Sequence, residues 1–341
     1  MKPTLSRGLL VWAVSAFVLA AVSLALCVLV MVFPEKTLVP LRAAIRAVEE
    51  QHREPKAVAE VSPTPEPTPE PTPEPTPTPE PTWAERFAEH FTEGIVSDAH
   101  SYQSPSLSVV VTDYDHVEPY PELCYHVADV YLTDIRQFRT AYSLEKPIYV
   151  SPLKIAESAG AIFAINGDTL INQTWGFVVR NGEIISADAP LYDVCLIYLD
   201  GHMETLSPFT YYAPDIADTG ELWQAWQFGP RLFDEEGRPL TEFNTADVLL
   251  PRHPRTALGY YEPGHYCFVA VDGYGAGGSA GADMYTLAQI MAELGCADAY
   301  NLDGGPTTNM VFGGDYANHP SGREKINDMI VICELQEDDE Q

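Results

Sequence analysis

The chain has 341 residues, with 49 Asp and Glu against 19 Lys and Arg, which gives a formal net charge of −30 at pH 7. Such a charge repels the phosphates of nucleic acids and no local basic stripe offsets it, so a nucleic-acid partner is excluded. Hydrophobic residues make up 46% of the sequence and aromatic residues 11%, which suffices for a large core and excludes global disorder.

An uncharged and proline-free run occupies residues 9–33, with the sequence LLVWAVSAFVLAAVSLALCVLVMVF. As a helix it would extend about 37 Å, which is enough to cross a bilayer. We therefore predict a transmembrane signal anchor at 9–33, after a cytoplasmic N-terminus at 1–8. A cleaved signal peptide is the alternative, but its apolar region would be only about 7–15 residues long, and Leu26 interrupts the small-residue box before Cys27.

Residues 34–61 are predicted to form a partly helical juxtamembrane segment, and residues 62–82 read SPTPEPTPEPTPEPTPTPEPT. Proline at every second position favours polyproline II, which makes 62–82 a stalk of about 65 Å. Basic residues flank the apolar run on both sides, so their distribution does not fix its orientation. A stalk is typical of a domain held outside a membrane. We expect a single-pass plasma-membrane protein with its N-terminus inside and its globular domain outside; a cytoplasmic spacer is the alternative.

The globular domain is expected at 83–333, followed by an acidic tail at 334–341. From residue 83 onward the chain has 12 Lys and Arg against 40 Asp and Glu, a net charge of −28, so an anionic ligand must be captured by a few local cations. Five cysteines lie in this part, without a C-x-x-C pair. Their odd number and spacing indicate neither a zinc site nor a complete disulfide framework, and we expect them to be reduced and buried.

Short apolar runs rich in β-branched residues predict strands at 107–111, 161–165, 175–179, 194–199, 266–271 and 329–333. A helix is predicted at 283–295, because apolar residues recur at helical spacing between an Asp283 cap and Gly295. A weaker helical pattern covers 152–159.

A further strand at 297–302 would complete a crossover unit with strand 266–271 and the helix between them. The fold class is therefore α+β (mixed α/β), with one strand-rich domain around a mixed sheet and flanking helices.

Three aspartates follow predicted strands, within Asn166-Gly167-Asp168, Asp272-Gly273-Tyr274 and Asp303-Gly304-Gly305. A single Asp-Gly after a strand usually marks only a turn, but three such ends, two of them joined by a crossover, favour a ligand site. The glycine amides after Asp303, with the hydroxyls of Thr307 and Thr308, are suited to hold an anionic oxygen.

Arg255 and Arg323 are the candidate cations for a phosphate, with an ordinary surface salt bridge as the alternative for each. The motifs H-E-x-x-H, G-x-S-x-G, G-x-G-x-x-G and the P-loop are absent from the sequence, and so are histidine clusters.

Several segments occur in order between about residues 160 and 333: AINGD at 164–168, GPRL at 229–232, PRTALG at 254–259, VDG at 271–273, the helix around 286–287 and NLDGG at 301–305. In these segments the chain resembles the phosphodiester glycosidase family, which includes N-acetylglucosamine-1-phosphodiester α-N-acetylglucosaminidase and bacterial exopolysaccharide-associated proteins. The chain departs at Pro306, where the family usually has a third glycine, and at Thr307 and Thr308, where serine is common. Proline removes one amide donor from the loop.

The resemblance implies hydrolysis of a sugar-1-phosphodiester, such as an N-acetylglucosamine-1-phosphodiester in cell-surface polysaccharide or glycoconjugates, at the C1–O bond. Asp303 would be the nucleophile or base, with Asp272 or Asp168 as the second carboxylate. Asn166 and Asn301 would orient the sugar, and Arg255 would bind the phosphate. The full set of expected substrate-binding residues is Arg255, Asn166, Gly167, Thr256, Asn301, Gly304, Gly305, Thr307, Thr308 and Arg323.

Two other functions stay open. Pro306 favours a non-catalytic ectodomain that binds anionic glycopolymers, and a phosphodiesterase would break the P–O bond in place of C1–O. The sequence requires no cofactor, although its spacing leaves open a divalent cation held by Asp168, Asp272 and Asp303.

Overall fold

The computed structural model describes residues 81–143, 149–169, 176–208, 210–322 and 324–335. They lie in a compact unit that extends over Pro77–Gln341. The predicted transmembrane helix, the juxtamembrane segment, nearly all of the predicted stalk and the end of the acidic tail fall outside the described residues. Within the described ranges, no helix is long and apolar enough to cross a membrane.

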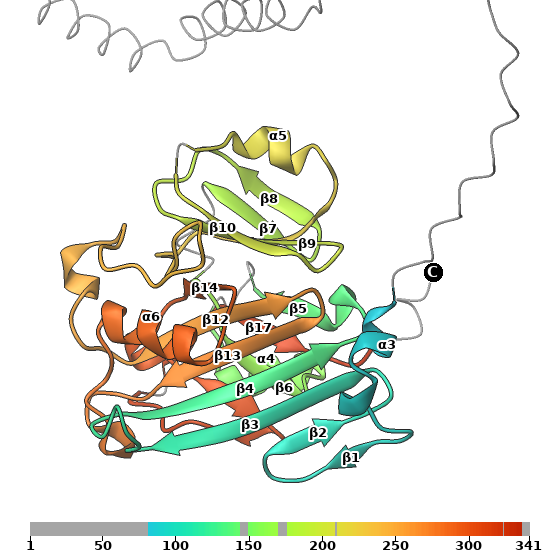
Figure 1. Ribbon diagram of the computed structural model, residues 1–341, viewed down its shortest axis with the longest axis horizontal. Helices are drawn as coiled ribbons and strands as arrows, with labels where there is room; N and C mark the ends of the chain where they lie inside the picture. The colour runs from blue at the N-terminus through green and yellow to red at the C-terminus, as the bar shows by residue number, and fades with distance from the viewer. Residues whose placement is uncertain (1–80, 144–148, 170–175, 209, 323, 336–341) are drawn as a thin grey trace, which may run out of the picture. The chain divides into compact units, whose positions relative to one another are not determined.

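Three sheets build the described unit (Figure 1). The seven-stranded sheet consists, in spatial order, of β1 Val96–Ser97, β2 Ser101–Gln103, β3 Leu107–Asp115, β4 Cys124–Leu132, β13 His265–Val271, β12 Arg255–Glu262 and β14 Asp298–Asn301. One five-stranded sheet consists of β10 Met203–Leu206, β9 Val194–Tyr198, β11 Leu222–Trp226, β7 Phe177–Arg180 and β8 Glu183–Ala187. The other consists of β16 Asp315–Tyr316, β15 Met310–Phe312, β6 Phe163–Asn166, β17 Asp328–Ile332 and β5 Phe138–Tyr142.

The predicted single mixed sheet is wrong, because the described strands form three sheets in which neighbouring strands are antiparallel. The predicted crossover is nevertheless present. β13 and β14 both pair antiparallel with β12, from opposite sides, so they run parallel to each other with β12 between them. The sequence pattern located the crossover but did not show that β12 lies between its two strands.

Four α-helices lie among the described residues: α3 Trp83–Arg86, α4 Pro152–Ala159, α5 Ala213–Ala217 and α6 Met284–Glu293. The two predicted helices are confirmed as α4 and α6. α6 begins where expected, because the Asp283 side chain accepts a hydrogen bond from the Thr286 amide at 2.7 Å. It ends just before Gly295, whose φ of +83° is a conformation that glycine adopts without strain.

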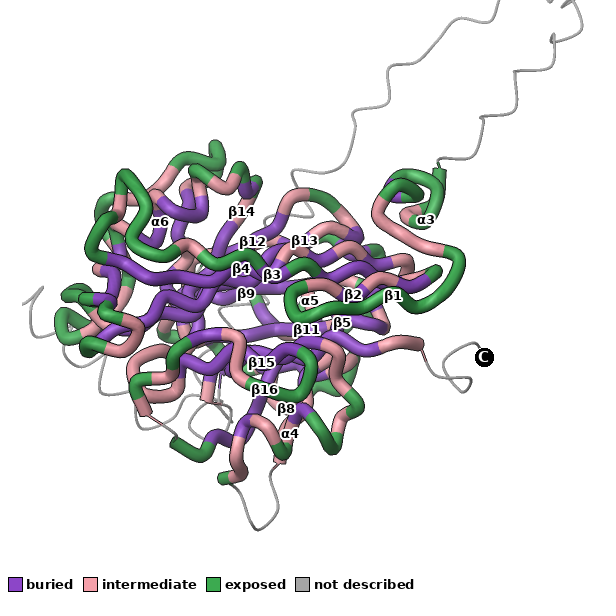
Figure 2. The backbone as a smooth tube through the Cα atoms, turned by 90° about the horizontal axis from the view of Figure 1, so that it is seen from below, coloured by how far each residue is buried: buried purple, intermediate pink, exposed green. Residues whose placement is uncertain are grey.

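The main core lies between the sheets and is rich in aromatic rings. Phe268 from β13 packs against Phe138 from β5 and Phe163 from β6 with tilted rings, whose centroids are 5.5 and 5.1 Å apart. Trp226 from β11 joins the same cluster. Figure 2 shows that the strands of this core are buried along most of their length while exposed residues gather in the loops. Each ring contributes about 1.5–3 kcal/mol of apolar burial, which holds the strand ends in fixed positions.

Candidate active site

The loops after β6 and β14 and the start of β17 lie next to one another. β6 and β17 are paired with Asn166 opposite Met329, which places Asp328 beside Gly167. After β14, the Asp303 amide donates a hydrogen bond to the Gly167 carbonyl at 3.2 Å. Three segments that are distant in the sequence therefore meet at one place.

A cavity of about 540 Å³ lies at this junction. That size suits a small ligand, since such sites span about 300–1,000 Å³. The lining residues are Tyr149, Asn166, Gly167, Thr169, Asp303, Thr307, Glu324, Lys325, Ile326, Asn327 and Asp328. A second cavity of about 550 Å³ lies beside α4, but none of the described residues that line it is Asp or Glu. The first cavity is therefore the better candidate for carboxylate chemistry.

Asp303 is held at this cavity by three hydrogen bonds. Its Oδ2 accepts from the hydroxyls of Thr169 at 2.7 Å and Thr307 at 2.8 Å, and its Oδ1 accepts from the Gly304 amide at 2.9 Å. Burial raises the pKa of Asp303 above its usual value, although the hydrogen bonds from the threonines oppose this effect. A carboxyl with fixed orientation and a raised pKa in a cavity is typical of a catalytic group.

Asn166 and Thr256 support the loop that carries Asp303. The Asn166 side chain donates to the Asp303 carbonyl at 2.7 Å and accepts from the Thr256 hydroxyl at 2.8 Å and the Asn309 amide at 3.1 Å. Both side chains are buried. Asn166 lines the cavity, but its polar atoms are used within the protein, so the structure gives the pair a positioning role in place of the predicted contacts with substrate.

Gly167 and Asp328 are in close contact. A Cβ on Gly167 would lie 1.9 Å from Asp328 Oδ2, which also accepts a hydrogen bond from the Asp168 amide at 3.0 Å. Asp328 is thus a second buried carboxylate at the cavity, and sequence reasoning missed it. The only signal was an acidic residue directly before the apolar run that forms β17.

For the hydrolysis of a sugar-1-phosphodiester that the family resemblance implies, we expect Gly167→Ala to reduce kcat/KM by about 100-fold, because the new methyl group forces Asp328 or the loop away by an ångström or more. Gly94→Ala is the matched control, since a Cβ there would meet no atom within 4 Å. Steady-state kinetics of the two variants test this. Wild-type kcat/KM in Gly167→Ala would contradict the proposed tight fit.

Asp168 is engaged in a buried ion pair beside the cavity. Its Oδ1 accepts from Arg180 Nη2 at 2.5 Å, and both side chains are fully buried. Arg180 also donates to the Ala225 carbonyl on β11. Asp168 is not among the residues that line the cavity, and its carboxylate is held by Arg180.

Arg255 does not reach the cavity. Its Nε donates to the Ala282 carbonyl at 2.9 Å, and its Nη2 donates to the Leu249 and Pro251 carbonyls at 2.6 Å. Burial lowers the pKa of Arg255 to about 10, which leaves it protonated at neutral pH. The prediction that Arg255 binds phosphate is therefore not supported: its guanidinium ties two loops together.

The glycine amides that were predicted to hold an anionic oxygen of the substrate donate to oxygens of the protein itself. The Gly304 amide donates to Asp303 Oδ1, and the Gly305 amide donates to the Pro254 carbonyl at 2.9 Å. Pro306 is the second residue of a 3₁₀ turn at Gly305–Thr307, a position where a missing amide hydrogen breaks no bond of the turn. The argument from Pro306 for a non-catalytic domain is correspondingly weakened.

The other predicted substrate-binding residues differ in position. Thr307 lines the cavity, whereas Thr308 and Asn301 are buried outside its lining. Asn301 donates to the Gly229 carbonyl at 2.8 Å. Arg323 falls outside the described residues; it directly precedes Glu324, which lines the cavity.

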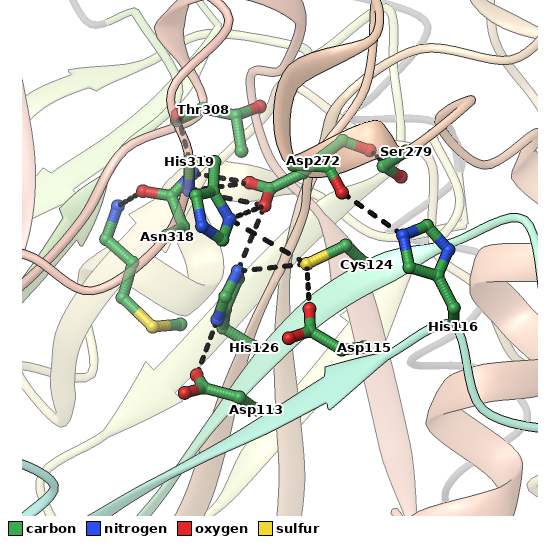
Figure 3. A network of polar contacts seen from close by, with 12 residues as sticks. Asp113, Asp115, His116, Cys124, His126, Asp272, Ser279, Thr308, Asn318 and His319 are labelled. Atoms are coloured by element: carbon green, nitrogen blue, oxygen red, sulfur yellow. Dashed lines mark hydrogen bonds and ion pairs between the residues drawn. The ribbon is translucent and has the colours of Figure 1, made fainter.

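Asp272 lies in a different cluster, with Cys124, His126 and His319 (Figure 3). The three predicted catalytic aspartates thus have three separate environments. Among the described residues there is one group of side chains that could hold a metal ion, and of the three aspartates it includes only Asp272. The prediction that the chain lacks a histidine cluster is wrong, because His126 and His319 lie together in this group. The sequence did not show it, since the two residues are far apart along the chain.

The five cysteines from Cys124 onward are free and buried, as expected. Cys124 differs from the predicted small hydrophobe, because its Sγ faces Asp115 Oδ1 at 2.8 Å.

Comparison with known proteins shows which folds and sequences the chain resembles. Over 73% of this chain and 91% of the other, the fold matches the zebrafish N-acetylglucosamine-1-phosphodiester α-N-acetylglucosaminidase catalytic domain auto-inhibited by its pro-peptide, with a TM-score of 0.55 and 19% identity. A hypothetical protein from Synechocystis matches with a TM-score of 0.45 and 15% identity over 67% of this chain and 62% of the other.

In sequence, the chain is 26% identical over 175 residues to an uncharacterized SPbeta prophage-derived protein, YomE, of Bacillus subtilis strain 168. That alignment covers 50% of this chain and 27% of YomE, so the chain spans about a quarter of the relative's length. The phosphodiester glycosidase family model matches residues 159–333. The chain belongs to the phosphodiester glycosidase family.

Proposed function

We propose that this protein hydrolyses sugar-1-phosphodiesters at the C1–O bond, releasing free sugar and leaving a phosphomonoester. The observation that carries the proposal is the buried Asp303 carboxyl, oriented by two threonine hydroxyls and an amide at a cavity of sugar-phosphate size. Family membership supports the reaction class. The name of the zebrafish relative supports N-acetylglucosamine as the first sugar to test.

The chemistry of the leaving group explains why the reaction does not require a strong general acid at this site. A phosphate monoester leaves readily, so a strong general acid matters less than it does for an ordinary glycoside. The larger demand is to stabilise positive charge at C1 and to supply a nucleophile. Asp303 fits that demand, since its oxygens are fixed by hydrogen bonds and face a cavity.

Asp328 is proposed as the second carboxylate, in place of Asp272 and Asp168. It is buried beside Gly167 and lines the same cavity as Asp303. Most glycosidases use two carboxylates that flank the glycosidic bond. In this assignment Asp303 attacks C1 or activates water, and Asp328 stabilises the developing positive charge from a neighbouring position.

Lys325 is proposed to attract the phosphate, since it lines the cavity in an otherwise strongly acidic domain. We expect Lys325→Met to raise KM about tenfold with little change in kcat, because an exposed cation contributes mainly to capture of the anion. Lys154→Met, which removes a cation from α4 that does not line this cavity, is the control. An unchanged KM in Lys325→Met, or an equal rise in both variants, would remove Lys325 from the site.

A substrate screen tests the proposed function. The full-length protein is incubated with α- and β-linked sugar-1-phosphodiesters, beginning with those of N-acetylglucosamine, and free reducing sugar is measured. Release from one anomer and none from the corresponding alkyl glycoside is expected. Tight binding of an anionic polysaccharide without release of sugar from any substrate would instead indicate a glycopolymer-binding domain.

We further propose that the domain is displayed outside the plasma membrane, anchored by residues 9–33 and held away from the surface by the stalk at 62–82. The length and apolar character of the first segment and the proline period of the second support this arrangement. Its substrate would then be a cell-surface glycoconjugate or an anionic glycopolymer. Protease accessibility of the domain on intact cells, compared with lysed cells, tests the orientation.

A further inference from the structure

Four side chains with metal-binding atoms converge at the start of β4, and none of them lines the proposed catalytic cavity (Figure 3). They are Cys124 and His126 from β4, Asp272 after β13, and His319 between β16 and β17. One ligand atom from each, namely Cys124 Sγ, His126 Nε2, an Asp272 carboxylate oxygen and His319 Nδ1, lies within 4.8 Å of all the others. The first three residues are buried, and the His319 side chain is 56% exposed.

The strand pairing explains why these residues meet. Cys124 and His126 are two apart on β4, so their side chains leave the same face of the sheet. β13 pairs with β4 with Val271 opposite Tyr125, and the Asp272 amide donates to the Cys124 carbonyl at 3.0 Å. The Asp272 side chain is therefore brought to the same face as the two ligands on β4.

The separations between these atoms agree with tetrahedral coordination. With Zn–S near 2.3 Å and Zn–N and Zn–O near 2.1 Å, the edges of the tetrahedron are about 3.6 Å from sulfur to nitrogen and about 3.4 Å from nitrogen to oxygen. Cys124 Sγ lies 3.6 Å from His126 Nε2 and 3.8 Å from His319 Nδ1. Asp272 Oδ2 lies 3.0 and 2.8 Å from the same two nitrogens, which requires only small adjustments.

The neighbours of the ligands orient them toward a common centre. Asp113, directly opposite His126 on β3, has its Oδ1 2.6 Å from His126 Nδ1, which fixes the orientation of the ring and points Nε2 into the cluster. Nε2 lies 3.0 Å from Asp272 Oδ2, and the proton between these two atoms must leave before Nε2 can bind a metal. Asp272 Oδ1 accepts from the Asn318 side chain at 3.0 Å, and the His319 amide donates to both oxygens, at 3.1 Å to Oδ1 and 3.2 Å to Oδ2. These bonds hold the carboxylate with Oδ2 toward the ligand nitrogens of His126 and His319. This pattern of carboxylate, histidine and metal is common in zinc sites.

The backbone also leaves room beside the ligand atoms. A Cβ on Gly277 would lie 2.9 Å from His319 Nδ1 and 3.0 Å from Asp272 Oδ2. Gly277 has a φ of +58°, which disfavours other residues as well. A side chain at this position would therefore intrude on the cluster.

We propose that Cys124, His126, Asp272 and His319 bind one Zn²⁺ ion in a structural site that fastens the segment carrying His319 to β4 and to the loop after β13. The donor set of one thiolate, two imidazoles and one carboxylate suits zinc, and four protein ligands close the coordination sphere. On binding, the Cys124 thiol releases its proton to solvent, and so do His126 Nε2 and His319 Nδ1 where they carry a proton toward Asp272 Oδ2. The exposed Asp115 carboxylate, which faces the Cys124 thiol, turns away.

A cysteine nucleophile served by His126 and Asp113 is a weaker interpretation of the same atoms. Asp272 Oδ2 is nearer to His126 Nε2 than Cys124 Sγ is, at 3.0 Å against 3.6 Å. The polar atom closest to Sγ is a carboxylate oxygen that would oppose formation of a free thiolate.

Zinc binding by the full-length protein tests the proposal. After loading with ZnCl₂ and exhaustive dialysis, elemental analysis is expected to find about one zinc per chain. The cobalt-loaded protein should show a thiolate-to-metal charge-transfer band in the near ultraviolet and the intense visible bands of four-coordinate Co²⁺. Competition with a chelating dye gives the affinity.

Matched variants distinguish the residues that bind zinc from neighbouring residues that do not. His319→Ala and Cys124→Ser should each weaken zinc binding more than 100-fold, and Cys124→Ser should abolish the charge-transfer band. Asp113→Asn, which alters only the partner of a ligand, should weaken binding about 10- to 100-fold. His116→Ala should bind like wild type, because His116 lies beside the cluster but contacts the Pro121 and Gly277 carbonyls and supplies no ligand atom. Since His319 is exposed, His319→Ala should keep the fold, which circular dichroism can verify.

Zinc content well below one per chain at micromolar free zinc would overturn the proposal, and so would wild-type affinity in both His319→Ala and Cys124→Ser. Rapid alkylation of Cys124 that zinc does not slow would favour the nucleophile interpretation. None of these outcomes depends on turnover of a phosphodiester, so the metal site and the proposed function can fail separately.

Discussion

Asp303→Asn is expected to reduce hydrolysis of a sugar-1-phosphodiester by about a thousandfold or more in kcat, with a much smaller change in substrate affinity. Asparagine keeps the size of the side chain and an oxygen that can accept from Thr169 or Thr307, so the loop geometry should survive. It removes the negative charge that attacks or stabilises C1. Steady-state kinetics together with direct binding of a non-hydrolysed analogue would separate the two effects.

The same variant is expected to be as stable as the wild type, or more stable by up to about 1 kcal/mol at pH 7. Burial raises the pKa of Asp303, so its ionisation disfavours the folded state. This group's contribution to stability is fully present below the pKa of the unfolded chain and is lost as pH rises through the folded-state pKa. The advantage of Asp303→Asn should therefore appear as pH rises and vanish in acid, as thermal unfolding at a series of pH values would show.

Asp315→Asn is the matched control for both measurements, since Asp315 is an exposed aspartate on β16. It should leave kcat and the pH dependence of unfolding unchanged. Turnover by Asp303→Asn within tenfold of the wild type, in protein shown to be folded, would contradict the assignment of Asp303.

The second large effect is expected at the buried pair of Asp168 and Arg180. Asp168→Asn should destabilise the protein by about 3–5 kcal/mol, because it leaves the fully buried guanidinium of Arg180 without its carboxylate. Urea unfolding of the full-length protein would measure the loss. Activity at temperatures well below unfolding should fall much less than in Asp303→Asn, since Asp168 does not line the cavity.

Two comparisons make the ion-pair prediction specific. The double variant Asp168→Leu with Arg180→Met should lose less stability than either charge-removing single variant, because no unpaired charge stays in the core. Arg238→Met, which removes a cation from the exposed pair with Asp234, should change stability far less, because solvent screens an exposed ion pair. Equal losses in the buried and exposed pairs would refute the claim that burial of the charge is the cause.

Local patterns in the sequence predicted many of the elements. The helices at α4 and α6 and the strands around Leu107, Phe163, Val194, His265 and Met329 are present, because periodicity and caps act over a few residues. The sheet was predicted incorrectly, since pairing depends on contacts between distant segments. The strand β12 between β13 and β14 is the clearest case: its own sequence reads as a strand, but nothing in it tells which neighbours it has.

The site was partly predictable for the same reason. Asp303, Thr307, Asn166 and Gly167 line one cavity as their positions after strands suggested. The prediction that Arg255 binds the phosphate is not supported. It was made because arginines are few in this acidic domain, but in the fold the guanidinium of Arg255 donates to backbone carbonyls.

Asp328 was missed because its role comes from its position beside Gly167 and not from a local motif. The spacing of residues in the sequence likewise did not predict the cluster of Cys124, His126, Asp272 and His319. The one local pattern is the Cys-x-His pair on β4, whose two side chains lie on one face because side chains alternate along a strand.

Hydrolysis in oxygen-18 water tests the central claim most directly. The wild-type protein and Asp303→Asn are incubated with a sugar-1-phosphodiester, and both products are analysed by mass spectrometry. Cleavage of the C1–O bond at Asp303 predicts that the label enters the free sugar, that the phosphomonoester stays unlabelled, and that Asp303→Asn gives almost no product. Label in the phosphate, or equal product from Asp303→Asn, would contradict this assignment.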